Sequence, residues 1–138
     1  MTGGSNMYRV LFVCVGNAGR SQMAEAYFNH MAKGRAVATS AGTVPADRIS
    51  PDVVNLMKDD GIDISGAHPK LLTQDMLENV DRVITMGCGV ENVCPARWIS
   101  TEDWGLPDPK GRSITEIRDI RDEIKEKVVR LLAEIEGR

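Results

Sequence analysis

Short apolar segments alternate with amphipathic segments along this chain. Residues 8–13 are a run of aliphatic and β-branched side chains, which is typical of a strand buried in a parallel sheet. Apolar residues then recur at helical spacing over 21–31, and two further strand-like segments follow at 36–41 and 81–86. A fourth, weaker strand is expected around 98–99. This alternation predicts an α/β fold with a parallel sheet covered on both faces.

Capping residues mark the remaining helices. A helix is expected from Pro51, with Ser50 as its N-cap and Gly61 beyond its end, and a short helix is expected to open at Thr73. The sequence Ser-Ile-Thr-Glu at 113–116 is typical of a capping box. An aliphatic stripe at steps of three and four follows: Ile114, Ile117, Ile120, Ile124, Val128, Leu131 and Ile135. It predicts a long last helix with one face in the core.

Length and composition favour one globular domain. The chain has 138 residues, of which 42% are hydrophobic, enough for a core without disulfide support. Its longest apolar run, 10–15, is far shorter than the ~20 residues of a membrane helix. The net charge is −3 with no basic cluster, so we expect neither nucleic acid nor a membrane as a partner. Residues 1–6 lack the pattern of a signal peptide. We expect them to be a flexible tail before a single domain over 7–138, in a cytoplasmic protein.

Three cysteines are an odd number, which argues against a framework of structural disulfides. Each is therefore either a buried apolar residue or a reactive thiol. A zinc site is not expected, because no two cysteines have the spacing of a zinc-ligand pair and His30 belongs to a predicted helix. The sequence predicts no metal and no cofactor.

The segment between the first strand and the first helix carries the candidate chemistry. It reads Cys-Val-Gly-Asn-Ala-Gly-Arg-Ser over 14–21. Gly16, Asn17 and Gly19 tolerate positive φ, so the peptide N–H groups can point inward as an anion nest. The helix that follows adds the positive end of its dipole, and Arg20 offers a planar fork for two oxygens of a tetrahedral oxyanion. The expected oxyanion-binding residues are Val15, Gly16, Asn17, Ala18, Gly19, Arg20 and Ser21.

The same features are expected to activate Cys14. A helix N-terminus and a neighbouring cation favour the thiolate, which is the nucleophilic form of cysteine. Ser21 can donate its hydroxyl to the sulfur, and the Asn17 side chain can brace the loop backbone. The central atom of a bound oxyanion would lie over the sulfur. The loop therefore predicts nucleophilic attack on phosphorus or arsenic within a small oxyanion.

These residues resemble the low-molecular-weight protein tyrosine phosphatase family, and more narrowly its arsenate reductase branch. In that family a Cys-x5-Arg-Ser motif lies between the first strand and the first helix, and an Asp-Pro late in the chain, matched here by Asp108-Pro109, supplies the general acid. Ser-Ala-Gly-Thr at 40–43 and Gly-Ile-Asp-Ile-Ser at 61–65, with His68, match the family as well. The resemblance implies a three-layer sandwich with a four-stranded parallel sheet, with the anion loop between its first strand and first helix.

Three differences from the phosphatases favour the arsenate reductase branch. Gln22 follows Arg-Ser, where the phosphatases commonly have Pro. Lys110 follows Asp-Pro, where they usually have a Tyr that sandwiches the phenol ring of the substrate. Cys88 and Cys94 occupy the region in which thioredoxin-coupled reductases carry two relay cysteines.

The resemblance also implies a role for each candidate catalytic residue. Cys14 attacks arsenate, Arg20 binds the oxyanion and Asp108 is the general acid. Asp103 is the nearest alternative acid and is expected on the surface. Cys88 and Cys94 would pass the resulting disulfide outward to thioredoxin or another thiol reductant.

Two other functions stay open, and the reductant is not determined. A hydrolase of phosphotyrosine or small aryl phosphates, working through a cysteinyl-phosphate, would use Cys14 and Arg20 without Cys88. A non-enzymatic oxyanion-binding or redox-sensing module is the third reading, and the intact Asp108-Pro109 counts against it.

The resemblance gives no complete potassium site. Some relatives bind potassium beside the loop, and Asn17, Glu25 and Ser40 match ligand positions. The fourth ligand, an Asp, has no match near His68, so no metal is assigned.

Overall fold

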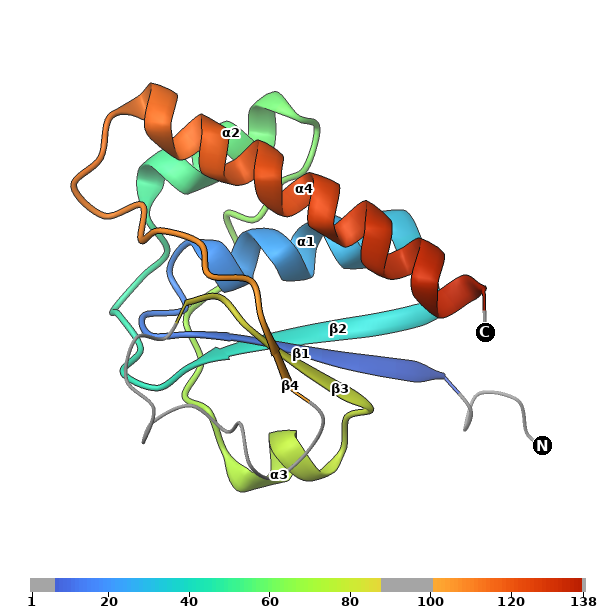
Figure 1. The fold of residues 1–138 in the computed structure, drawn as a ribbon. Coiled ribbons are helices and arrows are strands. Elements are labelled where there is room, and N and C mark those ends of the chain that lie inside the picture. Colours follow the sequence, from blue (N-terminus) through green and yellow to red (C-terminus); the bar gives the residue numbers. More distant parts are fainter. Residues whose placement is uncertain (1–6, 88–100, 138) are drawn as a thin grey trace.

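Four parallel strands form the central sheet. They are β1 (Tyr8–Cys14), β2 (Ala36–Gly42), β3 (Arg82–Thr85) and β4 (Thr101–Asp103), in the spatial order β2-β1-β3-β4. The computed structural model describes residues 7–87 and 101–137. Helices α1, α2 and α4 cover one face of the sheet and α3 lies on the other (Figure 1). The predicted three-layer α/β fold with a four-stranded parallel sheet is confirmed.

The helices begin close to the residues that the sequence indicates. They are α1 (Arg20–Ala32), α2 (Pro51–Asp59), α3 (Gln74–Glu78) and α4 (Ile114–Glu136). Thr73 caps α3, and Ser113 and Glu116 form the expected capping box of α4. Ser50 is the N-cap residue of α2, but its side chain makes no capping hydrogen bond. No helix within the described residues is long and apolar enough to cross a membrane.

The described fourth strand, β4, is Thr101–Asp103. The sequence favoured a strand around 98–99. Those two residues lie outside the described part of the chain.

Side chains of the central strand pack on both faces of the sheet. Val10, Phe12 and Cys14 belong to the large core cluster under α1, α2 and α4, whereas Leu11 and Val13 pack in a smaller cluster with α3. A strand buried on both faces needs apolar residues at every position. This requirement explains the uninterrupted apolar run that precedes the loop.

The long stripe of α4 is buried from Ile117 to Leu131, whereas its last residue, Ile135, is half-buried and its first, Ile114, is exposed. Ile117, Ile120, Ile124 and Val128 are all buried, but Ile114 remains 44% exposed. Periodicity identifies the apolar face of a helix, but it does not show where along the helix the core ends. Ile114 lies in the first turn of α4, beyond that end of the core.

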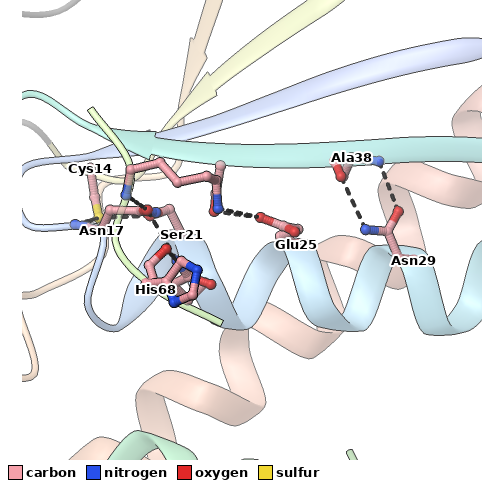
Figure 2. Close-up of polar contacts among 10 residues, drawn as sticks. Cys14, Asn17, Ser21, Glu25, Asn29, Ala38 and His68 are labelled. Atoms are coloured by element: carbon pink, nitrogen blue, oxygen red, sulfur yellow. Dashed lines mark hydrogen bonds and ion pairs between the residues drawn. The ribbon is translucent and has the colours of Figure 1, made fainter. Parts of the chain in front are cut away.

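Polar contacts hold α1 against its neighbours. Tyr27, which is buried, donates its hydroxyl to Asp60 at 2.7 Å, and Lys125 of α4 donates to the same carboxylate at 2.9 Å. Burial, together with the hydrogen bond to Asp60, raises the pKa of Tyr27 well above its ordinary value, so the hydroxyl stays a donor. Asn29 pairs with both backbone groups of Ala38 on β2 (Figure 2). These contacts fix the position of the helix that follows the candidate loop.

The carboxyl ends of the strands meet at one edge of the sheet. Cys14 is paired in register with Gly42, Val13 with Thr85, and Thr85 with Asp103. Ligands of parallel α/β sheets bind at this edge. The candidate loop leaves the sheet at Cys14 and therefore starts at the expected position.

We expect Ile124→Ala to lower the free energy of unfolding by about 2–5 kcal/mol, because it removes a fully buried side chain of α4 from the large core cluster. Urea denaturation measures this loss. The control Ile114→Ala, at the exposed end of the same stripe, should change stability by less than about 0.5 kcal/mol. Equal losses in the two variants would contradict the observed end of the core.

Candidate active site

Backbone hydrogen bonds from residues 43–50 fix the orientation of the loop peptides. The N–H groups of Thr43, Val44, Ala46 and Ser50 donate to the carbonyl oxygens of Cys14, Val15, Gly16 and Ala18, respectively, at 2.9 to 3.2 Å. The described peptide bonds are all trans, so each carbonyl points opposite to the next N–H group. The N–H groups that follow these four carbonyls therefore point away from residues 43–50. This is the arrangement that an anion nest requires.

Positive φ angles contribute less to the loop than the sequence suggested. Of the three residues expected to tolerate them, only Asn17 has one, at +51°. Gly19 has a φ of −146° and is needed for another reason: an added Cβ would lie 2.9 Å from Cγ of Pro109. Gly19 therefore allows Pro109 to pack against the loop. Gly16 and Gly19 tolerate positive φ but do not adopt it, because glycine permits that conformation without requiring it.

The sulfur of Cys14 lies at the centre of a polar network (Figure 2). Cys14 is 2% exposed, and its Sγ is 2.9 Å from Oγ of Ser21 and 3.2 Å from the backbone nitrogen of Asn17, which donates to it. The side-chain amide of Asn17 donates to the same Ser21 oxygen at 2.6 Å. Because the Ser21 oxygen accepts this bond, its one hydroxyl proton is free to point at the sulfur of Cys14. Two donors are therefore directed at the one sulfur.

Two residues without an assigned role hold the Asn17 amide in this orientation. Oδ1 of Asn17 accepts the backbone N–H of Lys70 at 2.8 Å and Nε2 of Gln22 at 3.0 Å. Nε2 of Gln22 also donates to the carbonyl of His68 at 3.1 Å. With its oxygen held from two sides, the amide can present only its nitrogen to Ser21. Gln22 is 2% exposed because it packs against Asn17 and the carbonyl of His68, and the helical apolar pattern of residues 21–31 does not single it out.

Residues at the potassium-ligand positions contact protein groups. Oγ of Ser40 donates to Glu25 at 2.5 Å, and Nζ of Lys70 lies 3.5 Å from the same carboxylate. The positively charged side chain of Lys70 therefore lies beside Glu25. Within residues 7–87 and 101–137, no three His, Cys, Asp or Glu side chains are grouped so that they could hold a metal.

The guanidinium of Arg20 is anchored to the ends of two neighbouring strands. Arg20 is 5% exposed, and its Nη1 donates to the carbonyls of Met86 at 2.7 Å, Leu106 at 2.9 Å and Gly87 at 3.3 Å. Nε and Nη2 have no acceptor among the described residues. They form one edge of the planar group and remain available for two oxygens of an anion.

A cleft of about 680 Å³ brings three of the predicted catalytic residues together. Cys14, Arg20 and Asp108 all line it, as do residues 44–46 and 48–52. Oδ1 of Asp108 accepts the backbone N–H of Lys110 at 3.0 Å, which is the turn expected of Pro-Asp-Pro.

The other two predicted catalytic residues are the candidate relay cysteines. Cys88 and Cys94 lie outside the described residues. Their roles therefore stay predictions.

A family model described as low molecular weight phosphotyrosine protein phosphatase matches residues 9–138. The chain belongs to this family. The family that the loop motif suggested is therefore confirmed.

Several similar proteins and solved structures are named as arsenate reductases, a narrower class than the family. The chain is 38% identical over 133 residues to the glutaredoxin arsenate reductase of Synechocystis sp., covering 94% of this chain and 99% of that one. A structure of an arsenate reductase in the phosphate binding state matches with a TM-score of 0.84 and 38% identity, over 94% of this chain and 99% of the other. The thioredoxin-dependent arsenate reductase of Corynebacterium glutamicum matches with a TM-score of 0.82 and 41% identity over 96% of this chain. The match spans only 63% of that longer chain.

We expect Gln22→Met to slow alkylation of Cys14 by iodoacetamide at pH 7 by about two- to tenfold, the effect of one lost hydrogen bond. Phosphate should protect the wild-type thiol from this alkylation. Mass spectrometry of the alkylated peptide gives the rate.

Gln74→Met, the same change at an exposed position on α3, is the matched control and should leave the rate unchanged. A folded Gln22→Met protein that reacts at the wild-type rate would show that Lys70 alone orients Asn17.

Proposed function

We propose that this protein reduces arsenate to arsenite, with Cys14 as the nucleophile. The observation that carries the proposal is a buried cysteine sulfur that accepts two hydrogen bonds inside a loop whose carbonyls are turned outward. The arsenate reductases that the chain resembles at 38% to 41% identity support the same chemistry. A reaction that consumes thiols also fits the cytoplasmic location expected from the sequence.

The first step forms a bond between sulfur and arsenic. The Cys14 thiolate attacks arsenic, and one oxygen leaves as water after Asp108 supplies a proton. The loop N–H groups, with Nε and Nη2 of Arg20, stabilise the negative charge on the remaining oxygens. No electrons have been transferred at this stage, and arsenic is still pentavalent.

The second step transfers two electrons. The Cys88 thiolate attacks Sγ of Cys14, and the sulfur–arsenic bond breaks with its electron pair left on arsenic, which departs as arsenite. The two sulfurs are thereby oxidised to a disulfide. Cys94 then attacks Cys88 and frees Cys14, and thioredoxin or another thiol reduces the final disulfide. These two roles rest on the family resemblance.

Hydrolysis of small phosphate esters is the second candidate. The family is named for a phosphatase, and the cleft is larger than a tetrahedral oxyanion requires. Its lining within the described residues, however, includes no Tyr, Phe or Trp against which a phenol ring could stack. We therefore assign hydrolysis as a weak side activity through the same Cys14 and Arg20.

Arg20→Lys should lose most arsenate reduction although the positive charge is kept. The Lys ammonium cannot reproduce the planar pair of donors, Nε and Nη2, of the guanidinium. Each charge-assisted hydrogen bond lost in the transition state lowers the rate about tenfold to a hundredfold. Steady-state turnover with thioredoxin measures the loss. Arg118→Lys, at an exposed position of α4, is the control and should keep full activity. Normal turnover in Arg20→Lys would assign oxyanion binding to the loop N–H groups alone.

Cys88→Ser should retain hydrolysis of a small aryl phosphate but lose thioredoxin-coupled arsenate turnover, because only the reduction needs a second thiol. Cys94→Ser should trap a Cys14–Cys88 disulfide, which peptide mass spectrometry after exposure to arsenate identifies. Arsenate turnover at the wild-type rate in Cys88→Ser, with thioredoxin as sole reductant, would rule out the intramolecular relay.

A further inference from the structure

The two candidate acids differ in their surroundings. Asp103 and Asp108 are both exposed, as the sequence suggested for Asp103. Oδ1 of Asp103 accepts the hydroxyl of Thr85 and the backbone N–H of Gly87, each at 2.8 Å. Of the two acids, only Asp108 is among the described residues that line the cleft. Proton transfer to a bound oxyanion therefore depends on Asp108 and on the segment that carries it.

The segment around Asp108 is stiff except at one point. The rings of Pro107 and Pro109 fix φ at those two residues, and the bulk of Pro109 restricts the backbone of Asp108 before it. Gly111, by contrast, has a φ of +78°, and an added Cβ would meet no atom within 4 Å. Neither a ring nor packing around the α-carbon limits the backbone there. The segment can therefore swing about Gly111 unless another contact holds it.

Arg112 makes contacts across this point. Its Nε donates to the carbonyl of Asp108 at 2.7 Å, and its backbone N–H donates to the carbonyl of Pro109 at 3.1 Å. Its Nη1 lies 3.6 Å from the carboxylate of Glu116 in the first turn of α4. That ion pair is exposed, so it contributes little. The bond from Nε is therefore the main contact by which the Arg112 side chain holds Asp108.

A second contact ties the segment to the oxyanion loop. Pro109 is buried, and it lies so close to Gly19 that an added Cβ on Gly19 would be 2.9 Å from Cγ of Pro109. Oδ1 of Asp108 accepts the backbone N–H of Lys110, so Oδ2 is the oxygen left to carry a proton. Pro109 brings the segment to the loop, and Arg112 fixes the carbonyl of Asp108 on the other side of Gly111.

We infer that Arg112 is a positioning residue for Asp108 in the first step of arsenate reduction. When the Nε donor is removed, the segment samples more orientations about Gly111. Fewer of these place the Asp108 carboxyl where it can give its proton to the departing oxygen, so attack by Cys14 slows. The inference rests on the proposed function, because that function assigns Asp108 its role as the acid.

Arg112 also lines the cleft, so direct attraction between its charge and the oxyanion is the competing explanation. Two variants separate the explanations. Arg112→Gln and Arg112→Met both remove the charge and have side chains of similar length, but only Gln has an N–H donor at the position of Nε. Arg118→Met, at an exposed position on α4, is the matched control.

Steady-state arsenate turnover with thioredoxin measures the effect. Arg112→Met should lower kcat/KM by about threefold to tenfold, the effect of one lost hydrogen bond, whereas Arg112→Gln should stay near the wild-type value. Asp108→Asn, whose amide oxygen can still accept the N–H of Lys110, should lower it by about a hundredfold or more. Arg112→Met should cause no further loss in the Asp108→Asn protein, because without the acid there is nothing left to position. Protection of Cys14 by phosphate against iodoacetamide should be equal in all variants.

A wild-type value in Arg112→Met, with Asp108→Asn slow, overturns the inference alone. Arg112→Gln as slow as Arg112→Met, or weaker phosphate protection in both, assigns the effect to charge and also overturns it. An equal loss from Arg112→Met in the presence and absence of Asp108 shows that Arg112 does not act through the acid. A wild-type value in Asp108→Asn, or no arsenate turnover by the wild-type protein, overturns that part of the proposed function, and this inference with it.

Discussion

The site depends first on the hydrogen bonds that turn four loop carbonyls toward residues 43–50. A carbonyl oxygen directed at a bound oxyanion would repel it, and a loop free to rotate its peptides would have to reorganise each time an anion arrived. Here the peptides are already oriented, so an oxyanion bound as proposed would require little rearrangement of the loop. The sulfur of Cys14 and the guanidinium of Arg20 are then held by separate contacts to Ser21 and to the ends of β3 and β4.

Local signals in the sequence predicted much of the fold. The apolar run of β1, the capping box of α4 and the stripe that follows it are each contained in a few consecutive residues. The loop motif likewise indicated a candidate nucleophile, and Cys14, Arg20 and Asp108 line one cleft as expected. Strands, helix caps and short loops such as these depend on residues close together in the sequence, so periodicity and residue type predict them.

The remaining features involve residues far apart in the chain, and no local pattern reports them. Nothing around Ser50 indicates that its N–H donates to Ala18 rather than that its side chain caps α2. The contacts of Lys70 with Asn17 and of Asp103 with Gly87 exist only once the strands are in register. The sequence showed these residues as ordinary polar positions, because long-range pairing determines their roles.

The bonds that orient the loop use main-chain atoms of residues 43–50 only, and this has an evolutionary consequence. Side chains in that segment, such as the 68% exposed Val44, form the outer wall of the cleft without taking part in those bonds. Mutation can therefore alter what the cleft accepts next to the anion while the oxyanion cradle keeps its geometry. Changes to these surface side chains can therefore reshape the outer wall of the cleft while the loop peptides keep their orientation.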